Sequence, residues 1–401
     1  MKILHTSDWH IGKKLKGKEL KDDHRLFFEW LLKTIQEQHI ELMIVAGDIF
    51  DVTHPSNEAL KQYYQVLLEI TKTSCKHVII IGGNHDSIHT LNAPKEILKL
   101  LNVQVVGGVP EDIADEIINV NDEVIVCAVP FLRDKDVKKS IMGESYEDRI
   151  EAVKQGINKH YQQLADLVQV HKNKGLPIIA TGHLYVQNAN LSDSERDIQV
   201  GNLAGIDGLT FPSIFDYVAL GHVHIPQKIV GAEHIRYAGS PIPLSFKERS
   251  DQKVVIVLDT TNEQLSDIEK IKVPNFRKLV LFKGSFDEVS IKIGLHTSEG
   301  DLIDWAEIQV EETYYDPSLS DRLSELVHAL KHVEVLRYTI NYANKVEGLN
   351  ELYGSDNITE LNPKDVFEKR IEGDEIEDKD SLMSIYGELL DWMQTNETEK
   401  V

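Results

Sequence analysis

The 401-residue sequence has few cysteines and no long apolar run. Cys75 and Cys127, its two cysteines, lie in or beside apolar segments, which favours reduced core residues over a disulfide framework or a zinc knuckle. No stretch reaches the roughly 18 unbroken apolar residues of a membrane span. The opening MKILHTSDWH also lacks the apolar core of a signal peptide. We therefore expect a cytoplasmic protein without a membrane segment.

Basic residues are also scarce relative to acidic ones. The chain holds 43 Lys and Arg against 66 Asp and Glu, a formal net charge of −23. Proteins that bind nucleic acid usually have the opposite balance, because cationic side chains neutralise phosphates. Three alternatives follow. The substrate is not DNA; or metal ions, a local basic patch and a partner hold the DNA; or the acidity only keeps the protein soluble.

Short apolar runs predict buried strands, several of which end directly before a polar cluster. These runs are KILHT before Asp8, LMIVAG before Asp48, HVIIIGG before Asn84, PIIATG before His183 and YVALG before His222. Amphipathic helices are predicted at 24–38 and 57–72, between the first three strands. Side chains at the carboxyl ends of such strands can converge in one crevice. The pattern predicts an α/β fold, a β-sandwich flanked by helices, over residues 1–270.

The remaining sequence predicts two further units. Strand and helix patterns alternate over 275–345, which indicates a small α/β capping domain. After a polar linker, the tail at 363–401 holds two helical segments, and the second has one apolar face formed by Leu382, Ile385, Leu389 and Met393. Helices this short are not stable alone. The tail packs on its own domain or on a partner protein. The acidic, linker-like sequence that precedes its second helix favours a partner.

Five motifs carry the candidate chemistry, and they share oxygen- and nitrogen-bearing side chains. We expect strand alternation to point Asp8 and His10 to one side, and likewise His222 and His224. The other motifs are GDIFD with Asp48 and Asp51, GGNHD with Asn84 and His85, and Gly-His with His183. Each motif alone is weak evidence, since a single histidine is commonly structural.

Taken together, the motifs indicate metal binding. Buried carboxylates and histidines without a counter-charge are costly, whereas cations make such a cluster favourable. A donor set without thiolates suits manganese, iron or zinc. Two such ions about 3.5–4 Å apart activate a water and stabilise an in-line displacement at phosphorus. The predicted reaction is therefore phosphoester hydrolysis.

In this order, the motifs resemble those of the calcineurin-like metallophosphoesterase superfamily. HTSDWHIG, VAGDIFD, GGNHDS, LGHVH and YAGSPIPLSF at 237–246 are similar to the Mre-type nucleases within it. The resemblance implies a manganese-dependent DNA endo- and exonuclease of repair and recombination that works with an SbcC-like ATPase and can form a homodimer. It also implies two ions, one held by Asp8, His10, Asp48 and His224, the other by Asp48, Asn84, His183 and His222.

The same resemblance gives His85 a catalytic role, in which it stabilises the transition state or protonates the leaving oxygen. Archaeal relatives have a histidine three places after the bridging aspartate, whereas this chain has Asp51 there. As in related phosphatases, an Asp51–His85 pair would hold the imidazole in position.

A lysine-rich segment follows the first motif and is a candidate DNA contact. Its basic residues, Lys13, Lys14, Lys16 and Lys18, could bind DNA phosphates without base specificity. Alternatively, the segment is only a solvated loop. Two other functions remain open. A small-molecule phosphodiesterase or nucleotidase would fit the acidic chain, and a scaffold could retain the fold without catalysis.

Overall fold

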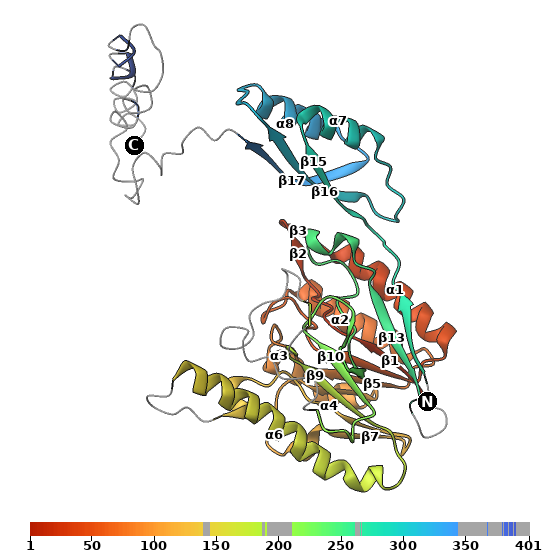
Figure 1. The fold of residues 1–401 in the computed structure, drawn as a ribbon. Coiled ribbons are helices and arrows are strands. Elements are labelled where there is room, and N and C mark those ends of the chain that lie inside the picture. The colour runs from red at the N-terminus through yellow and green to blue at the C-terminus, as the bar shows by residue number, and fades with distance from the viewer. Residues whose placement is uncertain are drawn as a thin grey trace.

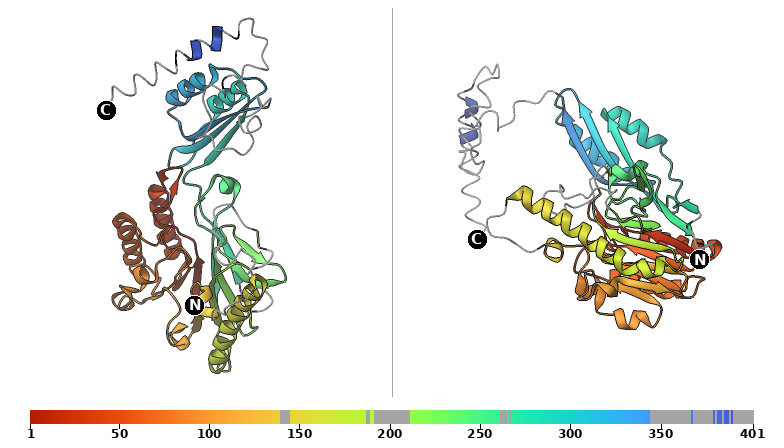
Figure 2. Two further views of the ribbon diagram at one scale, coloured as in Figure 1. Left: turned by 90° about the vertical axis from the view of Figure 1, so that its left-hand side faces the viewer. Right: turned by 60° about the horizontal axis from the view of Figure 1, so that its bottom comes forward.

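The structure, a computed structural model, describes residues 1–138, 145–186, 189–190, 211–260, 265 and 267–343, and in the C-terminal region 367, 379, 381–383, 385–387 and 389. Two six-stranded sheets pack face to face (Figures 1 and 2). Among the described residues, no helix is both long enough and apolar enough to cross a membrane.

The first sheet has the strand order β14-β13-β1-β4-β5-β6. Its four N-terminal strands are parallel, and β13 and β14 close one edge as antiparallel strands. The strands are β1 (Lys2–Thr6), β4 (Leu42–Ala46), β5 (His77–Ile81), β6 (Val103–Val106), β13 (Val254–Asp259) and β14 (Asp267–Lys272).

The second sheet has the order β11-β12-β10-β9-β8-β7, with β8, β9, β10 and β12 parallel. Its strands are β7 (Ile117–Val120), β8 (Val124–Cys127), β9 (Ile178–His183), β10 (Tyr217–Gly221), β11 (Gln227–Ile229) and β12 (Ala232–Tyr237). An apolar core fills the space between the sheets, and residues from β4 and β5 meet residues from β8, β9 and β10 there.

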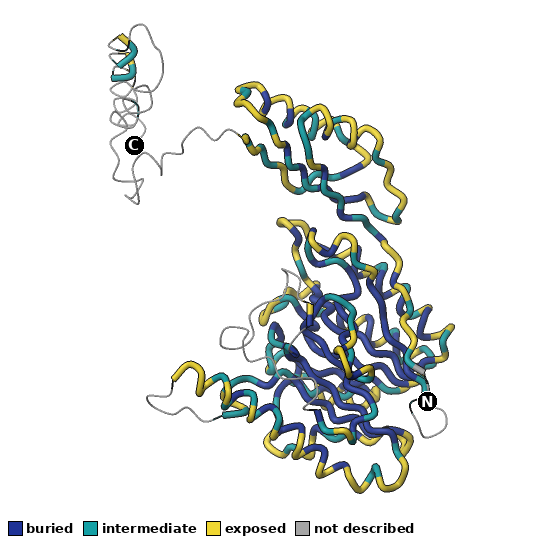
Figure 3. Tube along the Cα trace, in the orientation of Figure 1, coloured by how far each residue is buried: buried dark blue, intermediate teal, exposed yellow. Residues whose placement is uncertain are grey.

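Helices cover the outer faces of both sheets. The long ones are α1 (Lys21–Gln38) and α2 (Asn57–Thr71) on the first sheet and α6 (Tyr146–Lys172) on the second. Because both faces of the central strands are covered, β4 and β10 are buried at every position. Figure 3 shows the buried residues gathered in the middle of the sandwich. The predicted α/β sandwich flanked by helices is therefore confirmed.

Local signals explain the helix bounds. Ser56 caps α2 by accepting from the amide of Ala59, and His39 ends α1 in the left-handed conformation at φ 55°. Shorter elements connect the layers: β2 (Lys14–Leu15), β3 (Lys18–Glu19), α3 (Ile88–Asn92), α4 (Lys95–Lys99), α5 (Asp134–Val137), and the 3-10 helices η1 (Ile113–Glu116) and η4 (Phe246–Ser250).

A third, parallel sheet lies C-terminal to the sandwich. It consists of β15 (Leu279–Gly284), β16 (Asp304–Glu312) and β17 (Val333–Tyr342), and α7 (Phe286–Leu295) and α8 (Leu319–Ala329) share its own apolar core. It joins the sandwich through Phe276, Leu279 and Trp305, which belong to the core beneath α1. Arg277 lies over the Trp305 ring at 3.9 Å and pairs with Asp23 of α1 at 3.0 Å.

Most of the predicted tail at 363–401 lies outside the described residues. Within the part that is described, Phe367 stacks on Tyr386 with ring centroids 3.9 Å apart, while Ile385 and Leu389 are exposed. The packing of this segment on a partner stays a prediction.

The Arg277–Asp23 pair should contribute to stability. Arg277→Met would leave the Asp23 carboxylate buried without a cation, so we expect the free energy of unfolding to fall by about 3 kcal/mol. Urea unfolding followed by circular dichroism measures this. Arg25→Met is the matched control, because Arg25 pairs with Glu29 on the exposed face of the same helix and such pairs contribute little. Equal losses for both variants would contradict the prediction.

Candidate metal centre

The five predicted motifs meet at one edge of the sandwich, where β1, β4, β5, β9 and β10 end. Hydrogen bonds join the loops that follow these strands. The amide of Asp8 donates to Gly47 O at 3.0 Å, and the amide of His222 donates to Asp8 Oδ1 at 2.9 Å. The two sheets therefore contribute to one site.

Strand alternation does not explain how Asp8 and His10 converge. Strand β1 ends at Thr6, and both residues lie beyond it in the left-handed conformation, with φ of 52° and 46°. The amide of His10 donates to Asp48 O at 3.0 Å, and the Trp9 side chain is buried in the core beneath α1. His222, at φ 95°, also lies past its strand. Residues outside the favoured backbone regions are common at functional sites.

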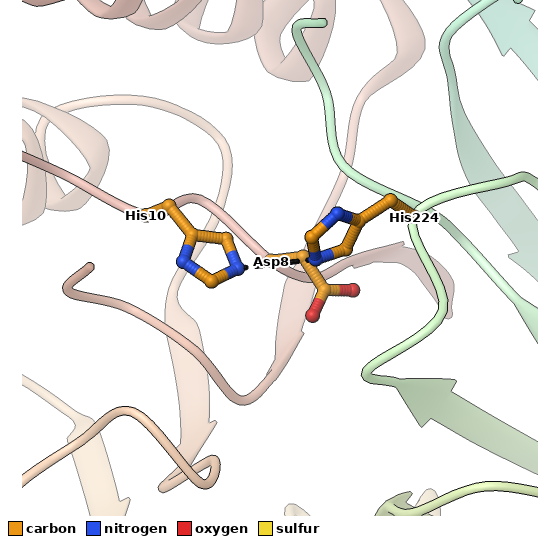
Figure 4. Close-up of side chains that lie close together, drawn as sticks. All are labelled: Asp8, His10 and His224. Carbon is orange, nitrogen blue, oxygen red and sulfur yellow. Dashed lines mark hydrogen bonds between the residues drawn. The ribbon is translucent and has the colours of Figure 1, made fainter. Parts of the chain in front are cut away.

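Asp8, His10 and His224 form one buried group (Figure 4). Each offers a ligand atom, and these atoms lie within 4.8 Å of one another. The Nε2 atoms of His10 and His224 are 3.2 Å apart. Two ring nitrogens that face each other at this distance need a proton or a cation between them, so the group suits a metal ion.

Asp8, Asp48 and His183 form a second group. His183 Nδ1 donates to Ala46 O at 2.9 Å, so its other ring nitrogen, Nε2, faces the site. This Nε2 lies 2.9 Å from Asn84 Oδ1 and 3.4 Å from Asp48 Oδ2. The His222 ring is 5.5 Å from the His183 ring.

Asp48 lies between the two groups. Its Oδ2 is 3.5 Å from His10 Nε2 and 3.4 Å from His183 Nε2, while Oδ1 accepts from the His85 amide at 2.9 Å. The single atom Oδ2 of Asp48 thus faces one histidine of each group. This is the geometry that a bridging ligand requires.

Burial sets the protonation of these side chains. It lowers the pKa of His10 to about 4 and that of His222 well below its usual range, so both imidazoles are neutral. Burial raises the pKa of Asp8 to about 6. Burial opposes the charge on His183, but Asp48 outweighs it and raises the pKa of His183 to about 9. Divalent cations take neutral imidazoles and ionised carboxylates as ligands, so a metal ion at His183 would displace the proton that Asp48 favours there.

His85 and Asp51 are close together, but the expected contact between their side chains is not formed. His85 Nδ1 donates to the backbone carbonyl of Asp51 at 2.6 Å. The Asp51 carboxylate instead lies 3.4 Å from His10 Nδ1 and accepts from Lys13 Nζ at 2.9 Å. His85 lies beside the backbone of the Asp51 loop, whereas the Asp51 carboxylate points toward the loop of His10. The two side chains therefore do not pair.

The lysine-rich segment forms the hairpin β2–β3, and its basic side chains all face carboxylates. Lys13 pairs with Asp51, Lys14 with Glu19 at 3.3 Å, Lys16 with Glu307 at 3.6 Å and Lys18 with Glu334 at 2.6 Å. Glu307 and Glu334 belong to β16 and β17, so the hairpin contacts the C-terminal sheet. A role of these lysines in DNA binding remains a prediction.

Sequence reasoning missed Asp86 as a residue of the site. Its buried carboxylate accepts from the amides of Ile49 at 3.1 Å, Phe50 at 3.0 Å and Gly83 at 2.8 Å. It therefore ties the Asp48 loop to the Asn84 loop. Its place as the last residue of GGNHD was a signal, but only the fold brings the three amides to it.

The glycine before His222 allows β4 and β10 to approach closely. A Cβ atom at Gly221 would lie 1.8 Å from Ala46 O and 2.9 Å from His183 Nδ1. The glycine is therefore required by the site geometry, because no side chain fits between the strands.

Family models agree with this geometry. A model described as calcineurin-like phosphoesterase matches residues 1–226, and one described as type 5 capsule protein repressor C-terminal domain matches residues 275–375. The first match defines the class of the protein, a calcineurin-like phosphoesterase.

Curated relatives narrow the class. The SbcD component of the nuclease SbcCD from Escherichia coli strain K12 is 34% identical over 94% of this chain and 94% of its own length. The proteins of the same name from Staphylococcus epidermidis and Bacillus subtilis are 30% and 27% identical, over 72% and 71% of this chain and 74% and 73% of their own lengths. The chain belongs to the SbcD family of nuclease subunits.

Substitution of Gly221 should disrupt the site. Gly221→Ala places a methyl group against Ala46 O, so β4 and β10 must separate and His183 must move away from Asp48. We expect this variant to lose bound metal, measured by elemental analysis after dialysis against manganese. Gly294→Ala is the control, since a Cβ there meets open space. Full metal content in Gly221→Ala would show that the close approach is not required.

Proposed function

We propose that this chain hydrolyses phosphodiester bonds of DNA at a pair of divalent metal ions. The observation that carries the proposal is the position of Asp48 Oδ2 between His10 Nε2 and His183 Nε2, at 3.5 and 3.4 Å. The groups on either side supply the ligands. One ion would be held by Asp8, His10, Asp48 and His224, and the other by Asp48, Asn84, His183 and His222.

When bound, such a pair of ions lowers the pKa of a shared water and stabilises charge on the phosphate oxygens. The protein residues set the geometry around it. Asp86 fixes the two loops that carry Asp48 and Asn84. His85, whose Nδ1 donates to a carbonyl, keeps Nε2 directed into the site, 4.0 Å from Asp48 Oδ2. From there it can donate to a phosphate oxygen or to the leaving oxygen.

The metal is proposed to be manganese. Histidine and amide donors suit a borderline ion better than magnesium, and iron and zinc are the competitors to be tested. We further propose a cytoplasmic protein that acts in DNA repair and recombination and can form a homodimer. The names of the relatives support a nuclease, which disfavours a small-molecule phosphodiesterase or an inactive scaffold.

The partner is proposed to be an SbcC-like ATPase, because the relatives are named as subunits of SbcCD. The formal charge of −23 gives a physical reason for a partner, since an acidic chain holds duplex DNA poorly by itself. We assign residues 1–270 to the nuclease domain, 275–345 to a capping domain and 363–401 to the tail that contacts the ATPase.

Removal of the bridging carboxylate should abolish both metal sites together. In Asp48→Ala we expect a loss of bound manganese from both sites and no hydrolysis of single-stranded DNA, because one side chain serves both ions. Elemental analysis and a gel assay with manganese measure these. His224→Ala is the comparison, since it removes a ligand from one site only. Normal turnover with two ions in Asp48→Ala would refute the bridging role.

His85→Ala should separate metal binding from catalysis. We expect the variant to keep both metal ions and DNA affinity but to lose roughly 10²–10⁴-fold in kcat, the range for a general acid or base. Single-turnover cleavage with manganese gives the rate. The control is His89→Ala, a histidine of the neighbouring helix α3 that lies outside the metal centre. Loss of metal in His85→Ala would make this residue a ligand instead.

Truncation tests the tail. A chain ending at residue 362 should keep its metal and its manganese-dependent cutting of single strands, since the proposed ligands all precede residue 225. It should no longer co-purify with the ATPase or cut duplex ends in an ATP-dependent way. Co-purification at the level of the full chain would place the contact elsewhere.

A further inference from the structure

A buried ion pair lies behind His224. Glu248, on η4, and Lys253, just before β13, are both almost fully buried, and Lys253 Nζ donates to Glu248 Oε2 at 2.6 Å. Buried ion pairs are expensive to desolvate and seldom stabilise a fold more than apolar residues would. Their presence so close to the metal centre therefore calls for a role beyond stability.

The geometry places this pair against the rear of the imidazole. His224 Nε2 faces His10 in the site, and His224 Nδ1 lies 3.8 Å from Glu248 Oε1. Lys253 Nζ also donates to the carbonyl of His224 at 3.1 Å. The ring and the backbone of one histidine are thus contacted from behind by the same two charged residues.

The segment 237–246, the motif YAGSPIPLSF, supplies no proposed ligand but helps to hold Glu248 in place. Ser240 Oγ and the amide of Leu244 donate to Oε2, each at 3.2 Å, and Ser245 Oγ donates to Oε1 at 3.0 Å. Ser240 also accepts from Lys253 at 2.9 Å. These contacts fix the carboxylate in one orientation.

His10 has a parallel arrangement. Its Nδ1 faces Asp51 at 3.4 Å, and Asp51 in turn pairs with Lys13. By contrast, His183 Nδ1 faces the neutral carbonyl of Ala46. Carboxylates behind metal-bound histidines fix the ring and make it a better donor, and their removal weakens metal binding.

We infer that Glu248, with Lys253, is a positioning residue that strengthens the metal site formed by Asp8, His10, Asp48 and His224. This rests on the proposed two-metal function. Lys253 balances the buried carboxylate, and the carboxylate orients His224 with Nε2 toward the ion. The other ion site, where a carbonyl lies behind His183, does not depend on this pair.

The test is a calorimetric titration of the full chain with manganese. In wild type, two binding steps are expected, and fewer than two would count against the proposed function rather than this inference. In the double variant Glu248→Gln with Lys253→Met, both charges are removed, so no buried ion is left unpaired. We expect one step to weaken roughly 10–100-fold while the other stays unchanged, with thermal unfolding close to wild type.

Glu116→Gln is the matched control. Glu116 is fully buried and lies 2.8 Å from His160, a histidine outside the metal centre, so this variant should keep both binding steps whatever its stability. Glu248→Asp gives the same test if the double variant does not fold, since it retains a charge for Lys253 but withdraws the carboxylate from His224. Two unchanged steps, or equal weakening of both, would overturn the inference.

Discussion

The charge of Asp48 is the interaction on which the rest of the site depends. A carboxylate buried among histidines is unfavourable unless positive charge compensates it, and Asp48, 3.4 Å from His183 Nε2, raises the pKa of that imidazole to about 9. The surrounding loops are arranged around the same atom. Asp86 holds the loop of Asp48, Gly221 lets the second sheet approach, and the His85 amide orients the Oδ1 atom of Asp48. A metal pair would replace the proton on His183 and neutralise the carboxylates more completely.

The two-sheet architecture explains why the ligands come from distant parts of the sequence. Asp8, Asp48 and Asn84 follow strands of the first sheet, and His183, His222 and His224 lie at strand ends of the second. Neither sheet alone holds both groups. The packing between the sheets therefore sets the distance between His10 and His183 across Asp48, and a change in that packing acts on metal binding as well as on stability.

The strands that end at the site, the helices α1 and α2 and the convergence of the polar clusters could be predicted, because apolar periodicity reflects burial and parallel strands end at one edge. The 27-residue helix α6 was not predicted. The two helices expected between the first three strands correspond to α1 and α2. Contacts between loops could not be predicted, since they depend on tertiary structure. The Asp51 carboxylate faces His10 rather than His85. The identity of these residues does not predict which histidine the carboxylate contacts. Glu248 has no recognisable motif spacing, and only the fold places it behind His224.

A single carboxylate of this chain is proposed to bridge two metal ions. A crystal structure of the protein grown with manganese, with anomalous diffraction recorded at the manganese edge, would observe this bridge directly. We predict two anomalous peaks about 3.5–4 Å apart, both within bonding distance of Asp48, one beside His10 and His224 and the other beside Asn84 and His183. A single peak, or two peaks of which only one contacts Asp48, would show that the carboxylate does not bridge.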